Sequence, residues 1–461
     1  MMLRGLLLGL NVGVLLAWAL FPGQICAQDL INVGRLLFFT ETFRGNGRTC
    51  GSCHPADNNY TIDPAYIARL AVDDPLFTAD FLDNPLLLRK LGLVTVHADG
   101  FDRPGLQRAV PTLLGLARSL TPDFGAVGDR VHALGWSGDG VQVGGSLRDF
   151  ATGAVREHLA RSPARVEGVD FRRPTAQELR ALEAFMLSLG RGAEDELELG
   201  DFIGVTFRST LVEDGRKLFN REESGPCALC HRNGTALNEG GFNGMFEIGV
   251  QRRRNTPAQR LHPNLAGDGG FGACPPGAPS PKSGCGDGRF NAPSLIEAAD
   301  TTPSFHDNSA ATIEDAVRFY TTRAFAQSTE GQTLNIRLTS ADVVAIAALL
   351  RTLNAIDNIR SSNSFARLAL GRPPEAARSV LRLALADTSD AIADLTGGPR
   401  QLYATAVTLL RRAWLLERAS LLVPFTRARD YLLLRAMELQ VSAREQMYVP
   451  APAVGIVTGR S

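Results

Sequence analysis

The sequence predicts a mainly α-helical protein with two similar units in tandem and a helical extension at its C-terminus. Three observations support this. The pattern Cys-x-x-Cys-His occurs twice, at 50–54 and 227–231. Each copy follows a short amphipathic segment of similar sequence, Gly-Arg-Leu-Leu-Phe at 34–38 and Gly-Arg-Lys-Leu-Phe at 215–219. Residues 363–461 are rich in Leu, Ala and Arg with helical spacing, and they contain neither Cys nor His.

Composition places the chain among ordinary globular proteins. Its 461 residues are 44 % hydrophobic and 21 % charged, which is enough for a sizeable core, and this length predicts about three domains. The 48 basic and 48 acidic residues give a formal net charge of zero. This balance indicates neither a nucleic-acid partner nor an anionic membrane surface.

The repeated Cys-x-x-Cys-His motif is the attachment signature of c-type haem. Two thiols three residues apart can form thioethers with the vinyl groups of one porphyrin, and the following imidazole then ligates the iron. This predicts two covalent haems in two tandem cytochrome-c-like domains, held by Cys50, Cys53 and His54 and by Cys227, Cys230 and His231. The alternatives are a structural zinc site, for which the four cysteines must converge, and a redox Cys-x-x-Cys pair.

The N-terminus is typical of an export signal. Arg4 precedes an apolar run from Gly5 to Phe21, and Ala27 offers a small residue at a cleavage position. We therefore expect residues 1–27 to be a signal peptide and the protein to be periplasmic or otherwise exported, as c-type haem attachment requires. The alternatives are an uncleaved membrane anchor, because the run approaches spanning length, and lipidation of Cys26.

Each unit is expected to close with an amphipathic helix. In the first unit a capping box at 175–178 precedes an apolar face, and Gly190 ends the helix. In the second unit Thr339 or Ser340 caps a helix from Asp342 to Leu353. These helices either lie against a haem edge or simply pack in the core.

The domain boundaries follow from these elements. We assign 28–195 to the first haem domain, 196–362 to the second and 363–461 to the extension, with an acidic linker at 191–207. The extension has helical periodicity at 375–395, 401–423 and 426–443, which predicts a helical hairpin or a three-helix appendage. Its role is packing against the haem domains, docking or oligomerisation.

Two further cysteines flank a loop rich in Pro and Gly. Cys274 and Cys285 are eleven positions apart, and in an oxidising compartment a local disulfide is the simplest interpretation. The alternative is a pair of free or metal-binding thiols.

Several segments resemble the bacterial dihaem cytochrome c peroxidases and their MauG-like relatives. Thr-Thr-Pro-Ser-Phe-His-Asp-Asn-Ser at 301–309, with Pro-Ser-Leu at 293–295 and Thr-Ile-Glu-Asp-Ala-Val at 312–317, resembles the second-haem region of that family. Residues 37–54 resemble its first-haem region. The segment between the haems is matched by Val110-Pro111-Thr112 and by Gly135-Trp136-Ser137-Gly138. The resemblance covers roughly residues 30–357 and leaves out the extension.

The resemblance implies a division of labour between the haems. His54 would carry the peroxide-reactive iron and His231 an iron that relays electrons. The family's second ligand of the relay iron lies fourteen positions after the His of Phe-His-Asp; it is Met in the peroxidases, Tyr in MauG-like proteins and Tyr320 here. A phenolate favours ferric iron, whereas a thioether does the reverse. The competitor is Met245, and the alternative role of Tyr320 is a core aromatic.

Trp136 matches a family Trp that lies between the haems and assists electron transfer; the alternative is an ordinary buried Trp. The family also has a Ca2+ site that uses a Thr, a Pro region and an Asn near the first insertion. Thr301 and Pro303 match that site, but Ala109 stands where the family has Asn, which argues against calcium.

The distal side of the reactive haem departs most from the family. Phe150 and Ala154 replace its Gln and Pro. Glu157 and His158 stand near its catalytic Glu, and either is a candidate to move the peroxide proton. His158 is also a candidate iron ligand, as is His97 from the preceding loop.

The resulting expectation is an exported dihaem oxidoreductase that reduces hydrogen peroxide or uses it to oxidise a substrate. Its electron donor or substrate is unidentified, with a small cytochrome or a copper protein as candidates. We expect no nucleic-acid partner, and membrane contact only through an uncleaved signal. Two other classes remain: a dihaem electron-transfer cytochrome without peroxidase activity, and a dihaem oxygenase that uses O2.

Overall fold

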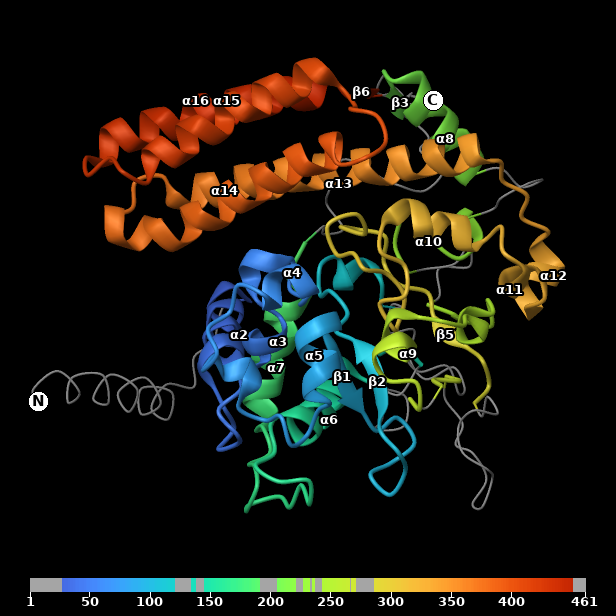
Figure 1. The fold of residues 1–461 in the computed structure, drawn as a ribbon. Helices are drawn as coiled ribbons and strands as arrows, with labels where there is room; N and C mark the ends of the chain where they lie inside the picture. The colour runs from blue at the N-terminus through green and yellow to red at the C-terminus, as the bar shows by residue number, and fades with distance from the viewer. Residues whose placement is uncertain are drawn as a thin grey trace, which may run out of the picture.

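A computed structural model describes residues 27–120, 134–137, 145–190, 205–220, 227–232, 234–236, 243–265, 267–270 and 286–450 (Figure 1). The predicted signal peptide up to residue 26, the proposed Cys274–Cys285 bridge and most of the predicted linker lie outside these residues. None of the described helices is both long and apolar enough to cross a bilayer.

The described chain is mainly helical, as predicted. Its β structure consists of three short antiparallel pairs: β1 (Leu93–Val96) with β2 (Leu106–Ala109), β3 (Val205–Phe207) with β6 (Tyr448–Pro450), and β4 (Met245–Phe246) with β5 (Phe290–Asn291). In the first pair Leu93 lies opposite Ala109. The β3–β6 pair joins the end of the extension to the segment that precedes the second motif.

The first motif follows helix α2 (Ala27–Thr40), which packs against α7 (Ala176–Leu187). The two helices meet at Gly34, where an added Cβ would lie 1.9 Å from the carbonyl oxygen of Ala181. Only a glycine allows this approach. The predicted capping box of Thr175 and Glu178 is confirmed, and the helix ends at Leu187, shortly before Gly190.

The helix before the second motif belongs to a helix pair of the same construction. Helix α8 (Thr210–Phe219) packs against α13 (Ser340–Ala369). They meet at Gly215, where a Cβ would lie 2.0 Å from the carbonyl oxygen of Ala345. The two segments that share the pattern Gly-Arg-x-Leu-Phe therefore have the same structural role. In each, the glycine lets the helix before the motif pack directly against the backbone of the closing helix.

The predicted end of the second closing helix, at Leu353, is wrong. Helix α13 has 30 residues and continues to Ala369, so it passes through the expected domain boundary between 362 and 363. The reason is that its second half buries polar residues. Ser362, for example, is fully buried and donates to the carbonyl oxygen of Ala384 at 2.9 Å. Thr339 caps the helix, as one of the two predicted alternatives.

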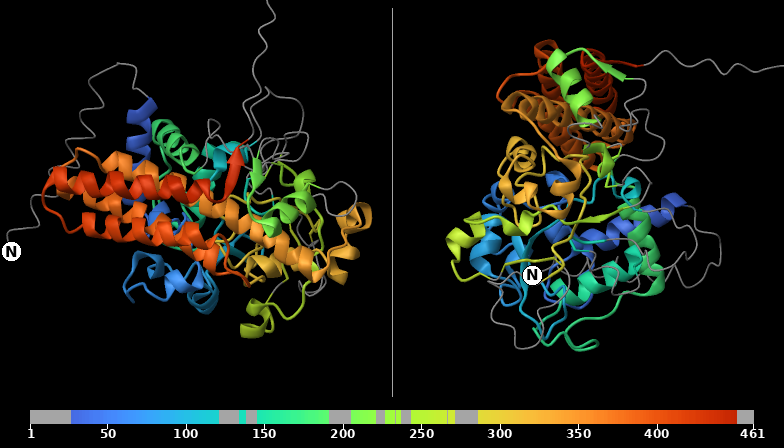
Figure 2. Two further views of the ribbon diagram at one scale, coloured as in Figure 1. Left: turned by 90° about the horizontal axis from the view of Figure 1, so that it is seen from above. Right: turned by 90° about the vertical axis from the view of Figure 1, so that its right-hand side faces the viewer.

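The three predicted helices of the extension are confirmed as α14 (Pro374–Thr396), α15 (Ala404–Ser420) and α16 (Thr426–Glu445). They pack with the second half of α13 as a bundle, in which α15 and α16 lie over α13 and α14 (Figures 1 and 2). One polar layer links all four helices: Nε2 of Gln440 lies within hydrogen-bond distance of Ser362 Oγ, Thr388 Oγ1 and Glu417 Oε1, at 2.9, 2.7 and 2.8 Å.

Short helices and loops complete the two units. The α-helices are α3 (Cys50–Cys53), α4 (Pro64–Ile67), α5 (Pro85–Leu91), α6 (Leu147–His158), α9 (Pro257–Leu261), α10 (Ile313–Phe319), α11 (Arg323–Ala326) and α12 (Thr329–Leu334). The 3-10 turns are η1 (Ala56–Asn58), η2 (Pro75–Phe77), η3 (Leu116–Arg118), η5 (Cys227–Leu229) and η6 (Val250–Arg252).

Candidate functional site

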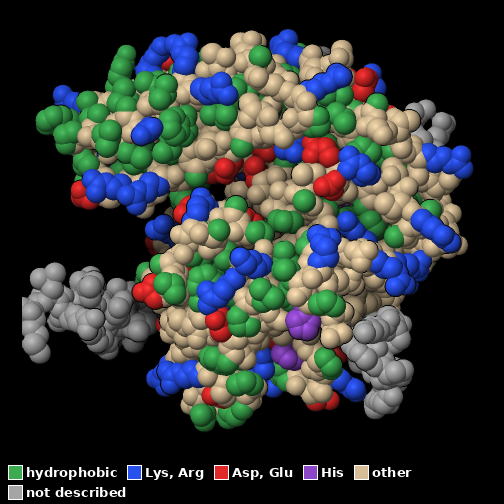
Figure 3. All heavy atoms as spheres, viewed as in Figure 1, with side chains coloured by type: hydrophobic (Ala, Val, Ile, Leu, Met, Phe, Trp, Pro, Cys, Tyr) green, Lys and Arg blue, Asp and Glu red, His purple; other side chains and the backbone are tan. Residues whose placement is uncertain are grey.

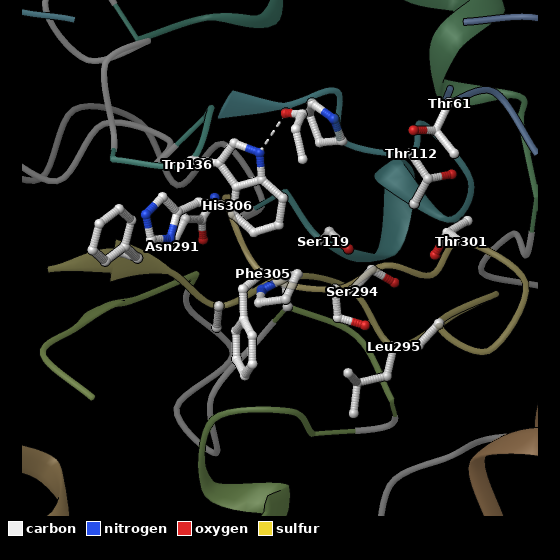
Figure 4. A pocket seen from close by; sticks show the side chains of 18 of the residues that line it. Thr61, Thr112, Ser119, Trp136, Asn291, Ser294, Leu295, Thr301, Phe305 and His306 are labelled. Carbon is white, nitrogen blue, oxygen red and sulfur yellow. Dashed lines mark hydrogen bonds between the residues drawn. The ribbon is translucent and has the colours of Figure 1, made fainter. Parts of the chain in front are cut away.

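Both Cys-x-x-Cys-His motifs line one continuous cavity. Its space free of protein atoms is about 2860 Å³, counting the part that opens to solvent, and its wall is mostly apolar. Figure 4 shows Trp136 in this cavity, with Thr61 and Thr112 to one side and Asn291 and His306 to the other.

The first motif presents two neutral thiols. Cys50 and Cys53 begin and end the single turn of α3, and they form no disulfide. Burial raises the pKa of the Cys50 thiol to about 12 and that of Cys53 to about 11. A redox Cys-x-x-Cys pair has a thiol pKa below the ordinary value. The raised values therefore argue against the redox alternative, while both thiols remain open to covalent attachment.

His54 is held in the form that binds a metal. Its Nδ1 lies 2.7 Å from the backbone oxygen of Tyr60. Because a carbonyl can only accept, Nδ1 carries the proton, which leaves the Nε2 lone pair for a ligand. Burial lowers the pKa of the imidazole to about 4, so the ring is neutral at physiological pH.

His231 has the same construction. Its Nδ1 lies 3.1 Å from the backbone oxygen of Pro293, and burial lowers its pKa to about 4. Burial also raises the pKa of the Cys227 thiol to about 12, and neither Cys227 nor Cys230 is in a disulfide. The carbonyl partner belongs to the segment Pro-Ser-Leu at 293–295, one of those that carry the family resemblance.

The four motif cysteines do not converge on a zinc site. Across the described part of the chain, no three His, Cys, Asp or Glu side chains come together in a way that could hold a metal ion. Structural zinc needs four protein ligands. The iron of a haem is different, since the porphyrin supplies four nitrogens and the protein adds only one or two axial ligands.

Of the three distal candidates near the first motif, the structure places only His158 at the cavity wall. It is the last residue of α6, and its backbone oxygen accepts a hydrogen bond from the Asn46 side chain at 2.9 Å. Burial lowers the pKa of its imidazole, so the ring is held neutral. A charge on His158 would in turn lower the pKa of His54, which shows that the two rings are close.

Glu157 is adjacent in sequence but does not line the cavity. Its Oε1 lies 2.7 Å from Nδ1 of His97 and 3.6 Å from a guanidinium nitrogen of Arg165. Burial by itself would raise the pKa of this carboxyl, but the His97 hydrogen bond and the nearby positive charges outweigh it and lower the pKa. Glu157 is therefore an ionised group behind His158, and it also holds His97 outside the cavity wall.

Tyr320, the residue that caps the C-terminal end of α10, lines the cavity on the side of the second motif. Burial raises the pKa of its phenol, and the charges that Cys230 and Cys227 would carry raise it further, so the phenol lies near both thiols. Met245 is not among the residues that line the cavity; it is in β4, opposite Asn291 of β5. The arrangement favours Tyr320 over Met245 as a second ligand.

Trp136 is fixed between the two halves of the site. Its ring nitrogen donates to the backbone oxygen of Ala109 at 2.8 Å, and its own carbonyl accepts from the Asn291 amide at 2.8 Å (Figure 4). The indole packs against two apolar clusters, one that contains Leu93 and one that contains Phe319. Trp136 therefore lines the cavity and connects two apolar clusters, whereas an ordinary buried Trp would lie within one core.

The three positions compared with the family's calcium site, Ala109, Thr301 and Pro303, all line the cavity. Ala109 offers no side-chain oxygen, and its carbonyl already accepts from Trp136. Thr301 Oγ1 donates to the Glu297 backbone oxygen at 2.8 Å. The arrangement therefore gives no support to calcium at this place.

Sequence reasoning missed a buried ion pair behind Trp136. Arg108 donates to Asp268 at 2.7 Å through Nε and to Ser137 Oγ at 2.7 Å through Nη1. His306 Nε2 lies 3.9 Å from the same carboxylate, and its ring stacks on Phe290 with centroids 4.0 Å apart. Arg108 and Asp268 are 160 residues apart, so no local pattern could have connected them.

No protein-family model matches the chain, and comparison with curated protein sequences gives no significant match.

Proposed function

We propose that the protein is an exported c-type oxidoreductase with two haem domains and two covalent haems, and that it acts on hydrogen peroxide. The observation that carries this proposal is that both motifs open into one cavity. Each motif has two cysteines outside any disulfide and an imidazole whose Nδ1 is bonded to a backbone oxygen. The repeated helix pairs that meet at Gly34 and Gly215 support two units of the same kind.

The residues present fit haem. Cys50 and Cys53 would hold one porphyrin and Cys227 and Cys230 the other, and Nε2 of His54 and Nε2 of His231 would each bind an iron. Bound haem would supply iron that takes a peroxide oxygen as ligand and exchanges electrons. The apolar wall of the cavity suits such groups.

His158 is the proton carrier in this proposal. Its neutral ring is placed to accept a proton from hydrogen peroxide in the cavity and to return it to the departing oxygen, which is general acid–base catalysis. The Glu157 carboxylate raises the pKa of His158 against the effect of burial, so it stabilises the protonated ring. Glu157 thus acts on the proton through His158, as a positioning group.

Electrons would pass between the two halves near Trp136, and Tyr320 would be the second ligand on the His231 side. A phenolate ligand favours chemistry of the MauG-like kind, on an organic or protein substrate. The electron donor and the substrate are left open, with a small cytochrome or a copper protein as candidates.

Stoichiometric titration of the purified holoprotein with hydrogen peroxide tests the proposal. We expect two haems per chain by pyridine haemochrome and a spectral change that saturates near one equivalent of peroxide in the ferric or half-reduced protein. If two haems are present but peroxide leaves their spectra unchanged in every redox state, the protein is an electron-transfer cytochrome. His158 would then be a ligand of the first iron. Reaction with O2 instead of peroxide would indicate an oxygenase.

A further inference from the structure

The outer surface of the α15–α16 hairpin has a composition that the haem chemistry does not explain. Five large apolar side chains are exposed between residues 415 and 434: Leu415, Leu422, Phe425, Tyr431 and Leu434. Leu422 and Phe425, in the turn that joins the helices, are 81 % and 73 % exposed. Single exposed apolar residues are common, but such a concentration marks a contact surface.

These residues follow the solvent-facing side of each helix. In α15 the buried residues Ala406, Leu410, Ala413 and Glu417 recur every three or four positions, which is the face toward the bundle core. Arg411, Leu415, Arg418 and Leu422 recur with the same spacing on the exposed side. Apolar and basic side chains therefore share that side.

The exposed charge of the hairpin itself is mostly basic. In the fully described hairpin 404–445, two glutamates are exposed, against the five arginines Arg411, Arg412, Arg418, Arg427 and Arg435. Between Leu415 and Leu434 no acidic side chain is exposed: Glu417 is buried and Asp430 is partly buried against Arg429. The net charge of zero, which predicts no anionic partner, conceals this local excess.

Shape and position agree with a flat partner. The joined end of α15 and α16 projects beyond the body of the protein, and α2, with which the described chain begins, lies on the same side (Figures 1 and 2). Hydrophobic side chains gather at this end, with Lys or Arg side chains beside them (Figure 3). The turn with Leu422 and Phe425 is a protruding apolar point.

We propose that this end of the bundle, which we call the bundle tip (residues 415–434), docks on an anionic phospholipid surface. Leu422 and Phe425 would enter the boundary between headgroups and acyl chains. Arg418 and Arg427, one helical turn or less from them, would bind lipid phosphates through guanidinium hydrogen bonds. The proposal does not depend on the haem reaction, and it gives the extension a function of its own.

The test is co-sedimentation of the purified holoprotein with vesicles of phosphatidylcholine, with and without phosphatidylglycerol. We expect binding that requires phosphatidylglycerol and weakens as salt screens the arginines. Leu422→Ser/Phe425→Ser and Arg418→Glu/Arg427→Glu should each weaken binding about tenfold or more, because each removes one of the two contributions. Haem content in both variants should equal that of the unmodified protein.

The matched control is Val72→Ser/Leu86→Ser, which removes two exposed apolar side chains from the body and should leave binding unchanged. Failure of the unmodified protein to sediment with anionic vesicles overturns the proposal. So does binding that persists in both tip variants, since the contact then lies elsewhere. A dimer in solution that Leu422→Ser/Phe425→Ser converts to monomer would assign the tip to a second copy of the chain instead.

Discussion

Nδ1 of His97 lies 2.7 Å from Oε1 of Glu157, and this bond turns the carboxylate away from the cavity that His158 lines. The neighbouring residues Glu157 and His158 of α6 therefore have different surroundings. His158 lines the cavity, while Glu157 and His97 form a hydrogen-bonded pair behind it. This arrangement makes the distal side of the site testable residue by residue.

We expect His158→Ala to slow the reaction with hydrogen peroxide by about 100-fold or more, the usual scale for one acid–base group. Glu157→Gln should slow it about tenfold or less, because it removes only the charge behind the imidazole. Stopped-flow spectroscopy under single-turnover conditions measures both rates. Equal losses in the two variants would show that Glu157 itself reaches the peroxide.

The same pair predicts a pH effect. Burial lowers the pKa of His158, and the Glu157 carboxylate partly opposes this. The ring must be neutral to accept a proton, so the rate should fall as the pH drops below its pKa. Glu157→Gln removes the charge that raises this pKa and should move the acid limb of the profile to lower pH. A limb that stays in place would exclude coupling between the two side chains.

At the second motif we expect Tyr320→Phe to remove an oxygen ligand from the iron. The ferric electron paramagnetic resonance signal of that haem should change from low-spin to high-spin, or the haem potential should rise as a softer ligand replaces the phenolate. Burial raises the pKa of the phenol, so binding as phenolate must release a proton and weaken at low pH. Met245→Leu is the matched control and should leave the spectrum unchanged. A spectrum that changes in Met245→Leu and not in Tyr320→Phe would assign the ligand to Met245.

The local features of the fold could be predicted because short-range chemistry determines them. A capping box such as Thr175 with Glu178 involves residues three apart, and each Cys-x-x-Cys-His motif lies within five residues. The length of α13 could not be predicted in the same way. Its buried Asn358 and Ser362 look like part of a polar helix end, and only their partners in α14, Asp394 and Ala384, make their burial tolerable.

The site shows the same division. Sequence identified His54 and His231 through their motifs, but Glu157 and His158 were equal candidates for the distal role. Successive helical residues point about 100° apart, so which of the two faces the cavity depends on how α6 packs. The partner of Glu157, His97, is 60 residues away. Tertiary contacts of this kind leave no local pattern in the sequence.

Gly34 and Gly215 should be intolerant of a methyl group. An alanine Cβ would lie 1.9 Å from the Ala181 oxygen or 2.0 Å from the Ala345 oxygen, so the helices would have to separate. We expect Gly34→Ala and Gly215→Ala each to destabilise the holoprotein by at least about 2 kcal/mol in denaturant unfolding. Gly153→Ala is the control: it lies in α6 with no atom within 4 Å of the new Cβ, and should be neutral or stabilising. Equal free energies of unfolding in the three variants would contradict the close helix contacts at Gly34 and Gly215.

The last prediction concerns carboxyl groups buried between the extension and the rest of the chain. Asn358 of α13 donates to Asp300 at 2.6 Å and to Asp394 of α14 at 3.3 Å. Burial raises the pKa of Glu297, Asp300 and Asp394, and together with the charge of Asp300 it raises the pKa of Asp390 to about 7. Helix α14 therefore contributes to a cluster of buried carboxyl groups that keep their protons at a pH where exposed carboxyls are ionised.

The sign of the effect follows from linkage. Asp390 binds a proton more tightly in the folded chain than in the unfolded chain, where its pKa is about 3.9. Its contribution to stability is complete below that value and is lost as the pH rises through about 7. Asp390→Asn should thus be more stable than the unmodified protein at pH 8, by a few degrees in Tm, with the difference shrinking toward pH 4. Glu375→Gln, an exposed carboxyl of the same helix, is the control and should track the unmodified protein throughout. An advantage for Asp390→Asn that is larger at pH 4 than at pH 8 would show that the folded chain holds Asp390 as a carboxylate.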